Sequence, residues 1–213
     1  MKGNTKKLAV LVIIAIIALL VMASMASAWW PVRAMWGKYA VTGFGQCLAA
    51  PLGFTNLIPN GPPGLWVIDT SSWEGVYIFR PDGTGVMKAI DRIIELQGPG
   101  IPNSTPTATS ANVQWDFQYN VANDGRITFT SGTGAWKICF PGDKITATGD
   151  APIYGFISPD GQTINVTLGP PEQLLTQVGA PTQLLCTVSN VLFKLSPDTT
   201  IDHKYPGCEM DED

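Results

Sequence analysis

Strict alternation of apolar and polar residues over 113–121 is the feature that most constrains the fold of this chain. Because successive side chains of a β-strand point to opposite faces, this period of two predicts a strand with one buried face. An Asn-Asp-Gly turn follows at 123–125, and a second alternating run begins at Ile127. The two runs predict an antiparallel hairpin. The apolar positions of the first run are Val113, Trp115, Phe117, Tyr119 and Val121.

The same arrangement occurs at two other places in the chain. An Asp-Gly turn at 82–83 follows a β-rich run over 73–79, and another at 160–161 precedes alternating residues over 163–168. Two further strands are predicted over 37–44 and 184–195. We expect the turn acids to hydrogen-bond the turn backbone. Those acids are Asp82, Asp124 and Asp160. The chain is therefore predicted to be all-β, an antiparallel up-and-down meander.

The segment 86–96 supports two interpretations. Its apolar residues fall on one helical face and its charged residues on the other, which is typical of a short amphipathic helix. The turn before it, however, places the segment where the hairpin partner of 73–79 belongs. Since hairpin context can override a local pattern, we expect a strand, with a short helix over 86–96 as the alternative.

The first 28 residues predict export. Lys2, Lys6 and Lys7 precede an apolar run over 8–22, and Ala-Ser-Ala at 26–28 forms a cleavage site, as in a secretory signal peptide. If the segment were retained, its length would suffice to anchor the chain in a membrane, which takes about 20 residues. We expect cleavage, and a periplasmic or extracellular protein.

We expect two further regions after the signal peptide over 1–28. A single β-barrel-like domain is predicted over 29–198, followed by an acidic C-terminal tail over 199–213. The chain has 13 basic and 17 acidic residues, a net charge of −4, and no run rich in Lys or Arg. This charge distribution argues against nucleic-acid binding.

Four cysteines bear on the fold: Cys47, Cys139, Cys186 and Cys208. An even number in an oxidising compartment predicts two disulfides. Their spacing fits neither a Cys-x-x-Cys redox motif nor a zinc site, so we expect a structural role.

The order of these segments resembles a lipocalin-like (calycin-type) β-barrel. The resemblance rests on the strand start Gly37-Lys38-Tyr39, the successive hairpins and a closing strand that carries Cys186. Tyr39 stands where lipocalins usually have Trp. The arrangement over 36–195 is also similar to uncharacterised secreted bacterial β-proteins, which imply no activity. An open β-sandwich is the alternative fold.

The barrel resemblance implies a disulfide pairing. In a closed meander the first and last strands pair antiparallel, so the end of the first strand lies beside the start of the last. Cys47 and Cys186 occupy those two ends. The resemblance therefore implies a Cys47–Cys186 disulfide, and a Cys139–Cys208 disulfide that ties the tail to the barrel.

The sequence offers no catalytic constellation. The single histidine, His203, stands next to Asp202 in the tail without a convincing nucleophile, and we expect a solvated residue there. Glycoside hydrolysis needs two carboxylates facing one cleft. Asp116, within the clearest strand, is expected to face water. We predict no enzyme activity, no metal site and no cofactor.

The aromatic residues indicate a binding role. If Trp115, Phe117 and Tyr119 point into a barrel, they can line a pocket for a small apolar ligand. The alternative is that they only fill the core. We therefore expect a non-catalytic protein that binds a small apolar ligand, or else a structural or interaction protein of the cell envelope or extracellular matrix. Membrane contact is expected only if residues 1–28 are retained.

Overall fold

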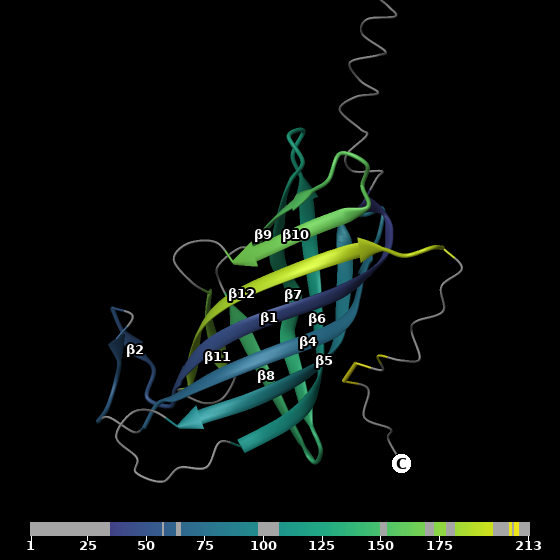
Figure 1. The fold of residues 1–213 in the computed structure, drawn as a ribbon. Coiled ribbons are helices and arrows are strands. Elements are labelled where there is room, and N and C mark those ends of the chain that lie inside the picture. Colours follow the sequence, from purple (N-terminus) through teal and green to yellow (C-terminus); the bar gives the residue numbers. More distant parts are fainter. Residues whose placement is uncertain are drawn as a thin grey trace, which may run out of the picture.

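The computed structural model of the chain consists of strands joined by turns and loops (Figure 1). No helix within the described residues is long and apolar enough to cross a membrane. The residues that the structure describes are 35–56, 58–62, 65–97, 107–149, 153–168, 173–177, 182–197, 205 and 207–208. The strands are β1 Gly37–Ala50, β2 Phe54–Thr55, β3 Ile58–Pro59, β4 Val67–Phe79, β5 Thr84–Gln97, β6 Thr107–Val121, β7 Arg126–Phe140, β8 Asp143–Gly149, β9 Ile153–Ile157, β10 Thr163–Leu168, β11 Gln173–Gln177 and β12 Gln183–Lys194.

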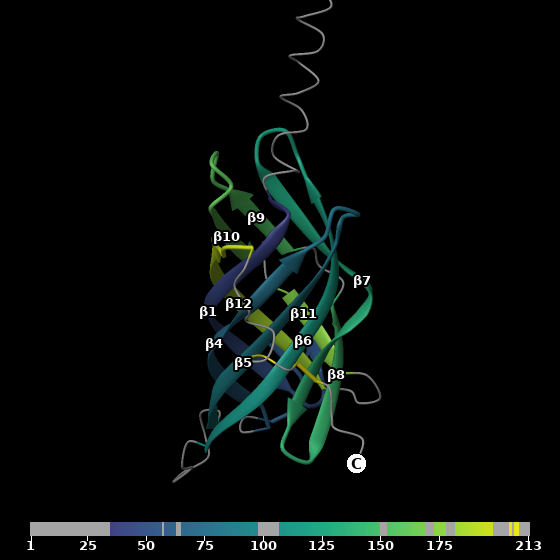
Figure 2. The ribbon, with the colours of Figure 1, turned by 90° about the vertical axis from the view of Figure 1, so that its right-hand side faces the viewer.

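Ten of the strands form one antiparallel sheet that closes on itself. Neighbours in the sheet follow the order β1-β4-β5-β6-β7-β8-β11-β12-β10-β9, and β1 pairs additionally with β12. The ring of strands wraps around a common interior in Figure 2. The predicted all-β, barrel-like fold is therefore confirmed, because the closing β1–β12 pair does not belong to an open sandwich. The two remaining strands, β2 and β3, pair only with each other.

The sheet departs from a simple meander after β8. The first part of β7 pairs with β9, and its last residues pair with β8. Likewise, β12 pairs with β11 through its start and with β10 through its end. The β6–β7 register shifts between Trp115 and Phe117, which separates the two halves of β7. A long strand with such an irregularity can take a different partner on each side of it.

The segment 84–97 is a strand, and the alternative of a short helix over 86–96 is wrong. β5 pairs along its whole length with β4 on one edge and from Thr84 to Glu95 with β6 on the other. Its pattern is not cleanly alternating because both of its faces are partly covered. Gly207 of the C-terminal segment lies against Lys88 and Gln114 on the outside of the sheet. Pairing on two edges outweighs the helical periodicity.

The three Asp-Gly turns have the predicted geometry. Each turn acid accepts a backbone N–H two residues further on: Thr84 to Asp82 at 3.0 Å, Arg126 to Asp124 at 3.1 Å and Gln162 to Asp160 at 3.0 Å. Side-chain and backbone hydrogen bonds from Thr84 hold the pKa of Asp82 below its usual value. The glycine that follows each acid has a positive φ, between 70° and 84°, a region that Gly enters without steric cost.

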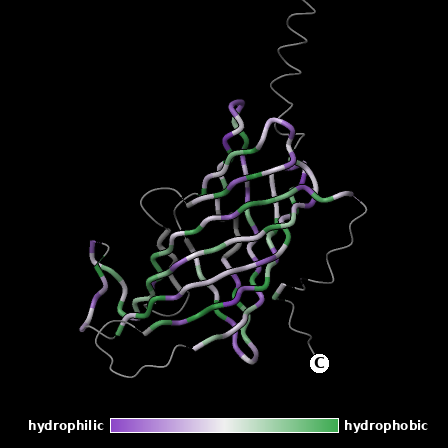
Figure 3. The backbone as a smooth tube through the Cα atoms, viewed as in Figure 1, coloured by the Kyte–Doolittle hydropathy of each residue, from purple (hydrophilic) through white to green (hydrophobic). Residues whose placement is uncertain are grey.

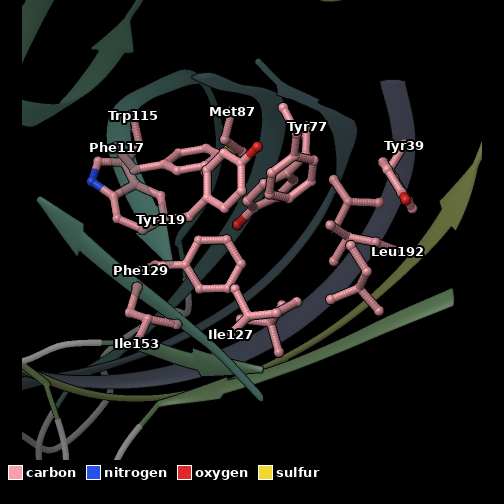
Figure 4. Close-up of a cluster of buried hydrophobic side chains, with 14 of the residues drawn as sticks. Tyr39, Tyr77, Met87, Trp115, Phe117, Tyr119, Ile127, Phe129, Ile153 and Leu192 are labelled. Carbon is pink, nitrogen blue, oxygen red and sulfur yellow. The ribbon is translucent and has the colours of Figure 1, made fainter. Parts of the chain in front are cut away.

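One end of the barrel interior is filled with aromatic side chains (Figure 4). Phe79 contacts Tyr39, Phe117 and Tyr119 edge-on, with ring centroids 5.1–5.5 Å apart. Two hydroxyls are satisfied at the same end, where Tyr39 donates to the Gly161 carbonyl and Tyr119 to the Arg80 carbonyl. Green and purple residues alternate along the strands in Figure 3, which reflects this inward packing.

Both implied disulfides are present. Cys47 of β1 is paired directly with Cys186 of β12 in the ladder, with their Cα atoms 4.1 Å apart. Cys139 of β7 is bonded to Cys208, which holds the C-terminal segment against the outside of the barrel. Two disulfide-bonded pairs suggest an oxidising environment, as for an exported protein. Residues 1–34, with the predicted signal peptide, lie outside the described residues.

Removing the Cys47–Cys186 bond should destabilise the closed ring. The bond joins residues 139 apart in sequence, so it restricts the unfolded chain strongly. We expect a Cys47→Ala/Cys186→Ala variant to lose roughly 2–5 kcal/mol of unfolding free energy, as is typical of small secreted domains. Denaturant titration under oxidising conditions measures this. An unchanged unfolding free energy would contradict a stabilising role for the bond.

Candidate functional site

The other half of the barrel interior holds a cavity of about 150 Å³. It extends from Tyr77, Met87 and Trp136, beside the aromatic core, towards the end of the barrel where β1 ends and β12 begins. Its remaining lining residues are Gly45, Cys47, Asp69, Ser71, Trp73, Ala89, Asp91, Ile93, Val113, Ile138, Ile153, Leu184, Cys186, Val188 and Asn190. The lining is mostly apolar, with a few polar groups among the side chains.

Small residues leave this space open. Gly45 and Ala89 occupy inward positions of β1 and β5, while neighbouring strands carry large side chains at most inward positions. At Gly75 of β4, a Cβ would collide with the backbone of Lys88 and Ala89, so β5 can approach closely only because the residue is Gly. The cavity is therefore a consequence of where the inward glycines and alanines stand.

Trp73 of β4 and Asn190 of β12 form a hydrogen-bonded part of the cavity wall. The Trp73 indole lies across β1 at Gly43 and Gly45, where a Cβ would collide with or crowd the ring. Beyond β1, its Nε1–H donates a hydrogen bond of 2.7 Å to Oδ1 of Asn190 on β12. Asn190 is only 5% exposed and is the one buried polar residue of the barrel's described part. The bond links two strands across a third and fixes the ring in the cavity wall.

Trp136 of β7 stands at the boundary between cavity and packed core. It stacks on Trp115, with ring centroids 4.6 Å apart and planes 5° from parallel. Its Nε1–H is buried without a hydrogen-bond partner. The stack gives the cavity a rigid aromatic wall that the packed core supports.

Two carboxyl groups also line the cavity. Asp69 of β4 and Asp91 of β5 each have a buried Oδ1 without a hydrogen-bond partner. Burial raises the pKa of Asp91 to about 7, against a hydrogen bond from the Arg92 backbone, and the Asp69 charge adds to the rise. Burial and then the charge of Glu95 raise the pKa of Asp69 to about 6. In both cases the environment disfavours the charged form.

The predicted binding residues lie in the packed core rather than on the cavity surface. Trp115, Phe117 and Tyr119 do point inward, as the alternation predicts, and Trp115 is only 1% exposed. None of the three lines the cavity. Trp115 supports it indirectly through the stack on Trp136. Their proposed contact with a ligand remains a prediction.

Sequence reasoning missed the residues that do line the cavity. A possible signal for Asp91 was its place within 87–93: read as a strand, Met87, Ala89, Asp91 and Ile93 share one face, so the acid interrupts an apolar row. The helical pattern instead placed Asp91 on the polar face. The search for paired carboxylates considered Asp116 and the turn acids and did not include Asp69 and Asp91, which line one cavity. Asp116 of β6 alternates with buried Trp115 and Phe117, as predicted for an outward residue.

No cluster of three or more His, Cys, Asp or Glu that could hold a metal is found in the described part of the chain. His203 and Asp202, and the acidic end 209–213, lie outside the described residues. Comparison with known proteins adds no assignment: neither a protein-family model nor a curated protein matches the chain.

A methyl group at Gly43 should disturb the Trp73 wall. The Cβ of Gly43→Ala would overlap the indole of Trp73 and Oδ1 of Asn190. We expect the variant to lose roughly 1–3 kcal/mol of stability and to change its near-ultraviolet circular dichroism, because the ring must move. Thr42→Ala, at the exposed neighbouring position, is the control. An unchanged spectrum in both variants would contradict the described packing of the indole.

Neutralising Asp91 should stabilise the protein only at higher pH. The folded pKa of about 7 lies above the unfolded value of about 3.9, so the folded state binds more protons between them and stability falls as pH rises from about 4 to 7. We expect Asp91→Asn to gain roughly 2 kcal/mol at pH 8, allowing for partial exposure, and little at pH 4. Thermal unfolding against pH measures the difference. A stability gain that is independent of pH, or an equal gain in Asp116→Asn, would argue against a raised pKa of Asp91 in the folded state.

Proposed function

We propose that this protein binds a small apolar ligand inside the barrel and acts by binding rather than catalysis. The supporting observation is the cavity of about 150 Å³ in the half of the interior that aromatic side chains do not fill. A protein interior is normally packed to the density of an organic crystal, with few voids. A cavity of this size, with most of its wall apolar, is a candidate ligand site.

The dimensions of the cavity limit the ligand. An engineered apolar cavity of about 150 Å³ in another protein stays dry and binds benzene. A ligand of about one aromatic ring therefore suits the space enclosed by Trp73, Trp136 and Val113. Aromatic walls favour a flat, unsaturated ligand, because offset-stacked and edge-to-face ring contacts add to the gain from burial.

The setting of this function is proposed to be periplasmic or extracellular. The signal-like sequence 1–28 and the two disulfides support export. The Cys47–Cys186 bond lies within the wall of this cavity. It therefore stabilises the site itself against unfolding.

An interaction protein of the envelope or matrix is the second candidate. Its support is a set of exposed aromatic side chains on the outer surface, Phe44, Phe156 and Phe193, each more than half exposed. Tyr154, on β9 with Phe156, is 42% exposed. Exposed apolar groups of this kind occur at protein contacts, although single ones are also common on monomers.

Blocking the cavity tests the binding role. Val188 lines it from β12, whereas Thr187 beside it is exposed, so Val188→Phe fills the space and Thr187→Phe places the same ring outside. We expect toluene and naphthalene to change the Trp emission of the wild type saturably, since two tryptophans line the cavity. Thr187→Phe should keep this response and Val188→Phe should lose it. An equal response in all three proteins would favour the second candidate.

A further inference from the structure

We propose that the ligand of this cavity carries a positively charged nitrogen, such as a protonated primary amine, which Asp91 and Asp69 bind while the apolar walls bury its ring. This inference rests on the proposed binding function and specifies its ligand class. The carboxyl groups come from adjacent strands and line the same cavity. An apolar ligand without a cationic group would leave both carboxyl groups without an opposite charge.

No basic side chain in the described cavity lining balances either carboxyl group, and the hydrogen bond from the Arg92 backbone reaches Asp91 only. Oδ1 of each carboxyl group is out of contact with solvent and makes no hydrogen bond. A buried polar group without a partner costs free energy, and a buried charge costs more. Each unsatisfied buried group calls for an explanation, and titratable groups with perturbed pKa values cluster at functional sites. A ligand ammonium supplies up to three N–H donors and the missing opposite charge.

The cavity lining that the structure describes contains acids and no basic side chain. None of the residues that line the cavity, from β1, β4, β5, β6, β7, β9 and β12, is Lys, Arg or His. The other titratable lining group is Tyr77, whose pKa burial raises above its usual value. Glu95 adds a further negative charge near Asp69. Arg92 lies on an outward position next to Asp91 and pairs with Glu74 at 3.2 Å.

Aromatic and polar walls fit the same ligand class. The rings of Trp73 and Trp136 line the cavity together with the two acids. A cation near the face of an indole is attracted by the ring, and more strongly when water is excluded. The Trp73–Asn190 hydrogen bond holds one of these rings in place before any ligand arrives. The cavity thus combines negative charge with apolar surface, and this combination selects amphipathic cations over neutral or anionic rings.

Three probes of similar size separate charge from shape: benzylamine, benzyl alcohol and benzoate. Their binding to the full protein is measured by calorimetry at pH 8 and pH 5. At pH 8 benzylamine is protonated and both acids are largely ionised. We expect it to bind roughly 10- to 100-fold more tightly than benzyl alcohol, since a charge-assisted hydrogen bond is worth that factor, and benzoate to bind least. At pH 5 both carboxyl groups are largely protonated, so the preference for the amine should shrink.

Matched variants assign the effect to the two acids. Asp91→Asn and Asp69→Asn should each reduce the preference for benzylamine, while Asp116→Asn, on an outward position, should retain it. Unchanged affinity for benzyl alcohol shows that the variants keep the cavity. If benzylamine and benzyl alcohol bind equally at pH 8, or if Asp91→Asn and Asp69→Asn both keep the full preference, the cationic ligand is wrong while the binding function stands. If no probe binds, both proposals fail.

Discussion

Pairing of β1 with both β4 and β12 is the constraint on which the rest of this structure depends. β1 is the strand at which the sheet closes, and the ladder on each side of it is continuous over nearly its whole length. Closure converts a curved sheet into a ring and removes the exposed edges of these strands. The Cys47–Cys186 disulfide reinforces the closing pair directly. Every inward position of β1 thereby faces an enclosed interior rather than solvent.

The content of that interior follows from the size of the inward side chains. Tyr39 and its aromatic neighbours fill one half, whereas Gly43 and Gly45 leave room in the other for the Trp73 indole and for the cavity. The same ring of strands therefore supplies a rigid support and a binding space. Packing at the filled end stabilises the barrel, so the open end can keep buried carboxyl groups that reduce stability at neutral pH.

Local patterns predicted the fold well because strands and turns have short-range signatures. Alternation over 113–121 and the Asp-Gly turns were sufficient for the hairpins, and the likeness to a closed barrel implied both disulfides. The pattern over 86–96 was ambiguous, because covering both faces of β5 disturbs its period of two. The divided pairing of β7 could not be read from local sequence, since it depends on which strands reach each half.

By itself, the sequence determined the all-β class, the turn geometry and the signs of export, because each depends on neighbouring residues. Only the tertiary structure decided which inward residues meet a filled space and which meet a cavity. Trp115, Phe117 and Tyr119 have the stronger sequence pattern, yet they pack against one another. Asp69 and Asp91 belong to the adjacent strands β4 and β5, whereas Asn190 of β12 is far from them in sequence, and only closure of the ring places it around the same space.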